Sequence, residues 1–431
     1  MLKPEREYKE KEISLDEAVS MVDDGDKIVA AMAGSEPQGL LERLADRGQE
    51  FSGVTVVSCL MMQDYGFTEP ELKGHIFNES WFYGEHDRKN HEHGNVSYIP
   101  NNLHGAGINK AANDDIDVFW GTAAPMDSRG YFSLSLGLTY EKVMIEEADL
   151  VVLEINENLP RTNGDTQVHI SRLDHVVEDN GPLIELPYID PGDLEEKIGR
   201  NVAELIEDGS TLQLGIGGIP NAITECLKDK KDLGVHTEML TDGMVDLFYE
   251  GAITNSRKSI WPGKMVATFA LGTQKLYDFI DGNIAVEFQQ GKVTNDPAVI
   301  EQNHKMVSIN TALQVDLTGQ VCSEALGNTQ YSGTGGQVDT HRGAQRSEGG
   351  RGIIALRSTA GGGDISTIVA QLPQGSKVTL GRNDIDTVVT EHGVAELKGK
   401  CIRDRVEAMI SIAHPDFRDE LRKEAREIEL W

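Results

Sequence analysis

An internal repeat with a spacing of about 185 residues is the feature that most constrains this fold. In each copy a helical segment ends at Asp-Gly, an apolar strand follows, and a turn containing glycine leads into a second helix. The paired motifs are Asp24-Gly25 with Asp208-Gly209, Gly34-x-x-Pro37 with Gly217-x-x-Pro220, Gly53-Val54 with Gly234-Val235, and Asp127-x-x-Gly130 with Asp316-x-x-Gly319. Because strand, turn and helix in this order build a parallel sheet, the repeat predicts two homologous α/β halves.

Local patterns predict the elements within each half. Ser14 and Glu17 form a capping box that opens a helix, and an apolar run over residues 149–154 suits a buried parallel strand. Residues 85–104 are polar and rich in histidine, which predicts a long loop. Further strands are expected at 27–32, 211–214 and 234–240, and further helices at 198–206, 403–412 and 416–430.

The domain boundary is expected between residues 178 and 193. Asn180-Gly181-Pro182 and Pro191-Gly192 supply turn residues between regular segments there. The sequence therefore predicts an α/β protein of two tandem domains, residues 1–185 and 186–431, each with a mainly parallel sheet flanked by helices.

The charge balance restricts the partners. The chain has 40 Lys and Arg residues against 71 Asp and Glu residues, a net charge of −31. Nucleic acids and anionic membranes are polyanions that bind through clustered Lys and Arg, so neither is expected as a partner. No apolar run approaches the roughly 18 residues of a membrane span, and residues 1–12 are charged where a signal peptide is apolar, which predicts a cytoplasmic protein. Adaptation to a saline cytoplasm and chance drift both stay open as origins of the acid excess.

Cysteine and histidine positions give little support to a metal site. The four cysteines are far apart and form no C-x-x-C pair, which disfavours a thiolate zinc site and a disulfide framework. They are Cys59, Cys226, Cys322 and Cys401. His86, His91 and His93 share a polar segment without a converging third ligand. The sequence also lacks a Gly-x-Ser-x-Gly elbow and a Walker P-loop, which argues against serine-hydrolase and ATP-driven mechanisms.

Residues 215–220, Gly-Ile-Gly-Gly-Ile-Pro, form a glycine-rich turn between a predicted strand and a predicted helix. Glycine lets the backbone approach a ligand closely, and a helix start offers N–H groups and a positive dipole to an anion. Pro220 stands where the dinucleotide fingerprint has its third glycine, so the turn does not match that motif. The pattern is typical both of a tight turn and of a ligand loop.

Glu238 is the carboxylate that the repeat singles out. The alternating pattern of residues 234–240 predicts a strand with His236 and Glu238 on one face. The paired position in the first half is Val57, so a carboxylate stands where the other half has a core-type side chain. A buried carboxylate is costly unless it is paired, which indicates functional use, whereas a solvated Glu at a strand end is the alternative.

A second glycine-rich stretch, Ser332-Gly-Thr-Gly-Gly-Gln-Val-Asp339, runs into a basic segment. Residues 340–360 hold four arginines in a protein that is otherwise strongly acidic. Glycine-rich backbone beside a basic cluster suits a ligand that carries phosphate, and a flexible surface loop is the alternative. The arginines are Arg342, Arg346, Arg351 and Arg357.

Taken together and in this order, the motifs resemble the acetyl-CoA hydrolase/transferase family, and within it the 4-hydroxybutyrate and butyrate CoA-transferases. The resemblance runs from about residue 14 to about residue 425. It rests on Gly215-Ile-Gly-Gly-Ile-Pro220, Thr237-Glu238-Met with Asp242-Gly243, Gly335-Gly-Gln-Val-Asp339, Val389-Thr-Glu-His-Gly-Val-Ala-Glu396 and Ile412-Ala-His-Pro-Asp-Phe417.

The resemblance implies two tandem CoA-transferase domains and a covalent glutamyl-CoA thioester on Glu238. It also implies backbone oxyanion donors at Ile219 and Gly336, with acyl-CoA and short-chain carboxylates as substrates, no metal and no ATP, and a homo-oligomer. The implied CoA-binding residues are Gly215, Ile216, Gly217, Gly218, Ile219, Asn310, Gly335, Gly336 and Arg351. Thr340-His341 and His392 depart from the residues common in the family, so contacts to the acyl group or to CoA are expected to differ there.

Two rivals stay open at this point. An acetyl-CoA hydrolase on the same scaffold differs only in letting water reach the covalent intermediate before a carboxylate does. A non-catalytic sensor of small molecules is the rival from another class, because related folds also bind effectors. The lack of a basic DNA-binding segment and the presence of Glu238 argue against the sensor.

Overall fold

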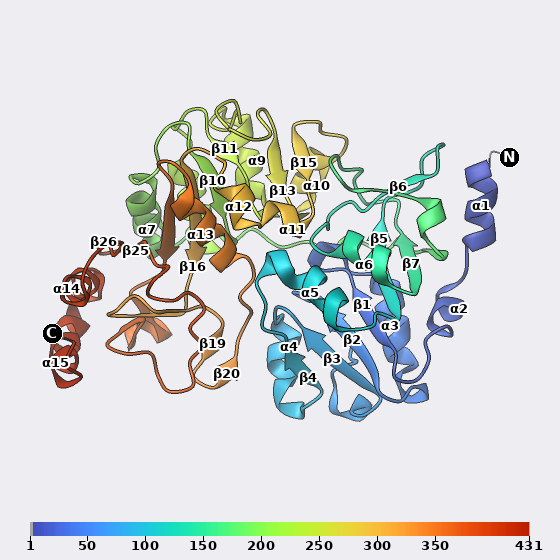
Figure 1. The fold of residues 1–431 in the computed structure, drawn as a ribbon, viewed down its shortest axis with the longest axis horizontal. Coiled ribbons are helices and arrows are strands. Elements are labelled where there is room, and N and C mark those ends of the chain that lie inside the picture. Colours follow the sequence, from blue (N-terminus) through green and yellow to red (C-terminus); the bar gives the residue numbers. More distant parts are fainter. Residues whose placement is uncertain (1–2, 431) are drawn as a thin grey trace. The chain divides into compact units, whose positions relative to one another are not determined.

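The computed structural model describes residues 3–430, and the contacts within the chain divide it into two compact units (Figure 1). The N-terminal unit consists of Met1–Leu186 and Val266–Thr294, and the C-terminal unit consists of Pro187–Met265 and Asn295–Trp431. The predicted domains, residues 1–185 and 186–431, differ from these units in the segment 266–294, which groups with the N-terminal unit. Residues 1, 2 and 431 of the predicted domains lie outside the described chain.

The N-terminal unit is built on a seven-stranded parallel sheet. The strand order is β4-β3-β2-β1-β5-β7-β9, and helix α6 (Glu141–Glu147) packs on β5. The core is formed by apolar side chains of the central strands and of helix α3 (Gln38–Asp46). The strands are β1 (Lys27–Ala30), β2 (Val54–Ser58), β3 (Ile76–Ser80), β4 (Val96–Tyr98), β5 (Val118–Ala123), β7 (Leu150–Ile155) and β9 (His175–Glu178).

The C-terminal unit has a six-stranded sheet of order β11-β10-β16-β21-β25-β26, in which only β26 is antiparallel. Helix α13 (Gln337–Arg346) packs on β16 and β21, and α7 (Asp193–Ala203) packs on β25 and on α8 (Gly218–Cys226). Helices α14 (Ile402–Ile412) and α15 (Arg418–Glu427) confirm the two predicted C-terminal helices (Figure 1). The strands are β10 (Thr211–Leu214), β11 (Gly234–Val235), β16 (Met306–Thr311), β21 (Arg351–Ala355), β25 (Thr387–Thr390) and β26 (Gly393–Glu396).

The predicted repeat is confirmed by the order of the strands. In each unit the first strand along the chain has the second strand on one side and a later strand on the other. Thus β1 lies between β2 and β5, and β10 lies between β11 and β16. The two sheets then continue in the same sense, through β7 and β9 in one unit and through β21 and β25 in the other. The fold class predicted from the sequence, two α/β domains with mainly parallel sheets, is confirmed.

Two matching turns confirm the repeat at atomic detail. Asp127 Oδ1 accepts backbone N–H groups two and four residues further on, and the Gly130 N–H donates to the Asp127 carbonyl oxygen at 3.0 Å. Asp316 Oδ1 makes the same two contacts, and the Gly319 N–H donates to the Asp316 carbonyl oxygen at 3.0 Å. Both glycines have positive φ, 91° and 94°, which a residue with a Cβ adopts only at a cost.

The long loop predicted at residues 85–104 is wrong. This segment forms helix α4 (Glu85–Asn90), a short 3₁₀ turn and the edge strand β4. The cause is the buried carboxylate of Asp87, which accepts hydrogen bonds from the Gly84 N–H, Ser80 Oγ and Asn78 Nδ2 and so fastens α4 to β3. A polar composition did not reveal these tertiary contacts. Among residues 3–430, no helix has the length and apolar character needed to cross a membrane.

Candidate active site

The carboxyl ends of the parallel strands in the C-terminal unit bring together most of the predicted site. Gly215 follows β10 directly, Asn310 is the last residue but one of β16, and Arg357 comes two residues after β21. The register of β10 with β16, and of β16 with β21, aligns these strand ends. Loops at this edge of an open parallel sheet are where α/β proteins bind their ligands.

Glu238 lies in a bend and not in a strand. The strand predicted over residues 234–240 is confirmed at its two ends but is interrupted at Glu238: β11 (Gly234–Val235) comes before the bend and a second short strand, β12 (Met239–Leu240), begins directly after it. Thr237 is buried, and its Oγ1 lies 3.1 Å from the Met239 carbonyl oxygen and 3.4 Å from the Leu214 carbonyl oxygen. The bend is therefore held against the end of β10, and the half-buried Glu238 side chain stands beside the strand ends.

The Glu238 carboxylate is held between an amide and a glycine of the same unit. Asn295 Nδ2 donates a hydrogen bond to Glu238 Oε2 at 2.8 Å. The backbone of Gly336 donates a second hydrogen bond to the carboxylate. Asn295 is fully buried and directly follows the short helix α11 (Gly291–Thr294). Sequence reasoning missed Asn295, because a single asparagine far along the chain from Glu238 carries no motif of its own.

These surroundings perturb the acidity of Glu238. Burial raises the pKa of the Glu238 carboxyl to about 7, and the negative charge of nearby Asp339 acts in the same direction. The hydrogen bonds from Asn295 and Gly336 oppose this shift because they stabilise the ionised form. A carboxylate with this pKa is ionised in about half of the molecules at neutral pH, and it is a stronger base than an ordinary Glu.

The first glycine-rich turn is open. A Cβ atom at Gly215 or Gly217 would meet nothing within 4 Å, and Gly217 has a φ of +108°. Helix α8 begins at Gly218, and no side chain caps its start in the described chain. The first N–H groups of the helix, including that of Ile219, therefore face the strand ends with the positive end of the helix dipole. Ile216 is partly exposed on this turn.

Asn310 belongs to a hydrogen-bonded cluster between β10, β16 and α13. Its Nδ2 lies 3.0 Å from Ser308 Oγ, 3.2 Å from Gln213 Oε1 and 3.3 Å from Thr340 Oγ1. Ser308 Oγ also donates to Gln213 Oε1 at 2.8 Å. The cluster fixes the Asn310 side chain and ties it to the helix that begins after Gly336.

Of the four arginines, Arg357 is the one at this edge. Its Nε donates to Glu195, whose side chain also lies 3.3 Å from the position of a Cβ on Gly218. The guanidinium-bearing side chain is 55% exposed, so it is accessible beside the open turn. Glu195 thus holds the Arg357 cation next to the glycine-rich turn.

The structure does not bring Arg351 to the other predicted residues. Arg351 is the first residue of β21, so it lies at the amino end of the sheet, and its NH1 is 3.6 Å from a carboxylate oxygen of Glu396. The sequence does not reveal at which end of the strand Arg351 lies, because the register is unknown, and its contact with CoA stays a prediction. Arg342 pairs with Asp384 and Arg346 lies 3.7 Å from Glu301.

The histidine segment forms no metal cluster. His86 Nδ1 lies 2.9 Å from Asp64 Oδ2, and His91 Nδ1 lies 2.9 Å from the Tyr83 hydroxyl. Within the described residues, no group of three or more His, Cys, Asp or Glu side chains converges as a metal site would require.

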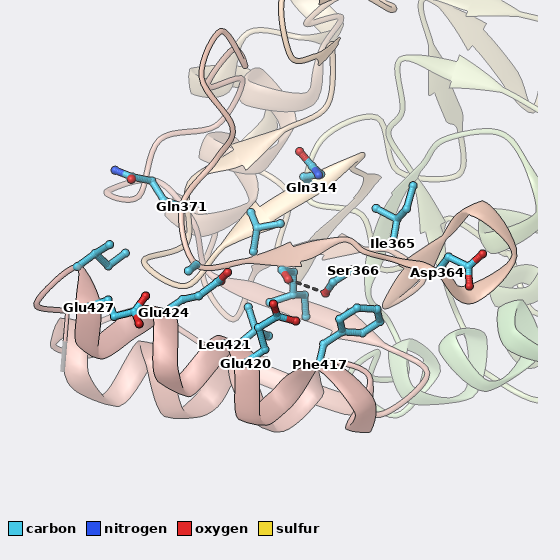
Figure 2. Close-up of a pocket in the computed structure, with 14 residues that line it drawn as sticks. Gln314, Asp364, Ile365, Ser366, Gln371, Phe417, Glu420, Leu421, Glu424 and Glu427 are labelled. Carbon is cyan, nitrogen blue, oxygen red and sulfur yellow. Dashed lines mark hydrogen bonds between the residues drawn. The ribbon is translucent and has the colours of Figure 1, made fainter.

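A separate groove lies beside the C-terminal helix. Figure 2 shows it between α15 and the strands β23 (Ile365–Ser366) and β24 (Ile368–Val369). Its volume is about 610 Å³, and its walls carry carboxylates such as Glu420 and Glu424. None of the predicted site residues lines this groove, so the candidate site is defined by the strand ends and not by this hollow.

Comparison with known proteins identifies the family. The model of the acetyl-CoA hydrolase/transferase N-terminal domain matches residues 2–186, and that of the C-terminal domain matches residues 272–425. Together they span most of the chain. The chain therefore belongs to the acetyl-CoA hydrolase/transferase family, and the resemblance predicted from the motifs is confirmed.

Relatives matched over nearly their full length show the class of enzyme within this family. The chain is 44% identical to a 4-hydroxybutyrate coenzyme A transferase of Clostridium kluyveri, over 97% of each chain. It is 45% identical to a succinyl-CoA:cyclohexane-1-carboxylate CoA transferase of Geobacter metallireducens, over 98% of this chain and 96% of the other. The crystal structure of RipA from Yersinia pestis superposes with a TM-score of 0.94 at 37% identity and covers 100% of both chains. The protein is an enzyme of the CoA-transferase class.

Proposed function

We propose that this enzyme moves CoA between short-chain acids and that Glu238 is its nucleophile. The acids are 4-hydroxybutyrate or butyrate on one side and acetate on the other, and the covalent intermediate is a glutamyl-CoA thioester on Glu238. The observation that carries this proposal is the placement of the Glu238 carboxylate, 2.8 Å from Asn295 Nδ2 and against the Gly336 backbone, with a pKa raised to about 7.

The reaction begins with an exchange at the acyl carbonyl. A carboxylate oxygen of Glu238 attacks the acyl-CoA carbonyl carbon, the C–S bond breaks, and CoA leaves as a thiolate. The product is an acyl-glutamyl anhydride. The thiolate then attacks the glutamyl carbonyl carbon of the anhydride, which forms glutamyl-CoA and releases the donor acid as its carboxylate. An acceptor carboxylate enters, and the same steps run in reverse with ping-pong kinetics.

The oxyanion formed on the glutamyl carbonyl needs donors that are already in place. Gly336 and Asn295 donate to the Glu238 carboxylate in the resting enzyme, so they remain bonded to the oxygen that carries the charge when the carbon becomes tetrahedral. The N–H of Ile219 at the start of α8 is the proposed donor to the oxyanion on the acyl side. One such donor is worth roughly 3–4 kcal/mol of transition-state stabilisation.

CoA is proposed to lie along the open turn. The backbone of Gly215–Ile219 and of Gly335–Gly336 lets the ligand approach closely, with Asn310 at the end of β16 beside it. We assign to Arg357 the phosphate contact that the sequence assigned to Arg351, because Arg357 lies at the strand ends and its side chain is exposed. The energy of the thioester passes through the anhydride and back, so no step consumes ATP or requires a metal ion. The cytoplasmic location and the homo-oligomer stay predictions.

Mass spectrometry of the covalent adduct tests the proposal. The protein is incubated with acetyl-CoA or butyryl-CoA without an acceptor acid, and the peptide that contains Glu238 is examined for attached CoA. Glu238→Gln is the matched control, because the amide keeps the volume and loses the nucleophile. An adduct on the wild-type peptide that is absent in Glu238→Gln is expected, whereas full transfer by Glu238→Gln contradicts the proposal.

The same incubation separates transfer from hydrolysis. Steady release of free CoA without an acceptor and without an accumulated adduct means that water breaks the intermediate, which is the hydrolase outcome. A panel of acceptors then identifies the acid. Acetate, butyrate, 4-hydroxybutyrate, succinate and cyclohexane-1-carboxylate are the informative set, because the relatives in Clostridium kluyveri and Geobacter metallireducens differ in the acid that their names state.

A further inference from the structure

Glu324 is a buried carboxylate that holds the second glycine-rich loop from two sides. It is 6% exposed and directly precedes the short hairpin of β19 (Ala325–Leu326) and β20 (Thr329–Gln330). Its main-chain carbonyl oxygen accepts the Tyr331 N–H at 2.7 Å and the Ser332 N–H at 3.2 Å. These contacts fix the start of the loop that ends at Gly336.

The side chain of Glu324 reaches the middle of the same loop. Its carboxylate lies 3.4 Å from Thr334 Oγ1 and 3.4 Å from Gln330 Nε2, and it accepts the Thr379 hydroxyl at 3.0 Å. Thr379 and Glu324 therefore anchor the loop to a segment far away in the chain. The contacts to Thr334 and Gln330 are long for hydrogen bonds, so the Thr379 hydroxyl is the shortest of the three donors to the carboxylate.

Glu324 is buried without a cationic partner in the described chain. No ion pair joins it to a Lys, Arg or His anywhere in residues 3–430. A buried carboxylate without a cation depends on neutral donors, and those of Glu324 come from Gln330, Thr334 and Thr379.

A short path of two contacts and two peptide bonds leads from Glu324 to the proposed nucleophile, Glu238. Thr334 is two residues before Gly336, Gly335 between them has a φ of +55°, and the Gly336 backbone donates to Glu238. We infer that Glu324 is a positioning residue that holds the loop 331–336 so that the Gly336 N–H points at Glu238. This inference rests on the proposed function, because it gives the loop a task only if Glu238 reacts.

The test compares Glu324→Gln with a matched control. Glu324→Gln keeps the size of the side chain and one acceptor oxygen. It replaces the other oxygen, toward which Thr334 Oγ1 and Gln330 Nε2 point, with an amide donor. Asp316→Asn is the control, since Asp316 is also buried and fastens its own turn by accepting from Thr318 and Gln320. Each variant is assayed for kcat, for the KM of acyl-CoA, for the single-turnover rate of adduct formation on Glu238, and for thermal stability.

The expected result is a selective loss of rate. Glu324→Gln should lower kcat and the rate of adduct formation together by about 10-fold to 100-fold, with the KM of acyl-CoA changed by less than about twofold. Thr334→Val should give a similar loss, and the double variant should lose no more than either single variant, because both act through one contact.

Two outcomes overturn the inference, and they are distinguishable from failure of the proposed function. Wild-type rates in Glu324→Gln, or an equal loss in Asp316→Asn, mean that Glu324 only stabilises the fold. If wild-type enzyme forms no adduct on Glu238, the proposed function fails and this inference fails with it.

Discussion

A Cβ atom placed on Gly336 would lie 1.8 Å from Glu238 Oε2 and 2.1 Å from Asn295 Nδ2. Gly336→Ala should therefore displace the nucleophile and lower transfer activity by at least about 100-fold, because a shift of about 1 Å at the reacting group has effects of this size. The readouts are the transfer rate and the adduct on Glu238. Gly381→Ala is the control, since a Cβ there meets nothing closer than 3.9 Å and activity should be retained. Normal activity of Gly336→Ala would show that the Glu238 carboxylate works from another position.

The raised pKa of Glu238 predicts the pH dependence of the reaction. Only the ionised carboxylate is a nucleophile, so kcat/KM for acyl-CoA should rise with pH, with a midpoint near the pKa of about 7, and level off above it. The initial transfer rate measured from pH 5.5 to pH 8.5 gives this profile.

Asn295→Ala tests the cause of that profile. The Asn295 amide stabilises the charged form of Glu238, so its removal should raise the pKa of Glu238 and shift the midpoint to higher pH. Since Asn295 is also a proposed oxyanion donor, the plateau should fall as well, by about 100-fold. A midpoint that stays in place, or moves to lower pH, contradicts the assignment of this hydrogen bond.

Arg357 and Arg351 lie at opposite ends of β21, and this difference is testable. Arg357→Ala should raise the KM of acyl-CoA by about 10-fold with little change in kcat, because a charge-assisted contact to phosphate contributes about 1.5–3 kcal/mol when present. Arg351→Ala should leave both constants unchanged, since its side chain lies beside Glu396 at the far end of the strand. Steady-state kinetics with varied acyl-CoA gives the answer, and a KM effect confined to Arg351→Ala would reverse the assignment.

Glu154 predicts how the stability of the N-terminal unit depends on pH. Its buried carboxyl accepts the Leu40 N–H at 3.1 Å, and burial raises its pKa to about 8. The folded state therefore binds a proton that the unfolded state has lost above its ordinary pKa of 4.5. Stability from this group is complete below pH 4.5 and is lost as the pH rises through 8.

Glu154→Gln should remove part of this dependence, because the amide mimics the protonated acid. In thermal unfolding between pH 5 and pH 9, the variant should gain stability over the wild type as the pH rises, by about 2–4 °C for each kcal/mol. Part of the pH dependence of stability should remain in the variant, because burial also raises the pKa of Glu36 to about 8. Glu157→Gln is the control: it changes an exposed acid nearby in the chain and should leave the pH dependence of stability unchanged. If Glu154→Gln shows the same pH dependence as the wild type, the group that binds the proton on folding is not Glu154.

The repeat could be predicted because it depends on local chemistry that sequence records directly. Asp127 and Asp316 each form their turn with residues at most four positions away, so the pattern Asp-x-x-Gly is sufficient. The loop predicted at residues 85–104 failed for the opposite reason. Asp87 fixes that segment by accepting hydrogen bonds from Asn78 and Ser80 of β3, and no local sequence pattern predicts these contacts.

The candidate site divides in the same way. The glycine-rich turns and Glu238 carry motifs, so they were found, and their roles stay predictions. The bend at Glu238 is not predicted because the alternation of apolar and polar residues continues in the sequence through Thr237, which is buried. The pairing of β11 with β10, however, ends at Val235. Asn295 and the choice between Arg351 and Arg357 depend on the position of each strand end in space, which only the register of the sheet supplies.

The segment 266–294 has a consequence for folding during synthesis. This segment packs into the N-terminal unit, although it is synthesised after residues 187–265, which belong to the C-terminal unit. Domains form as units while the chain emerges from the ribosome. The N-terminal unit therefore lacks some of its own contacts until residue 294 has been released, and a fragment that stops at residue 186 is an incomplete body even though a family model ends there.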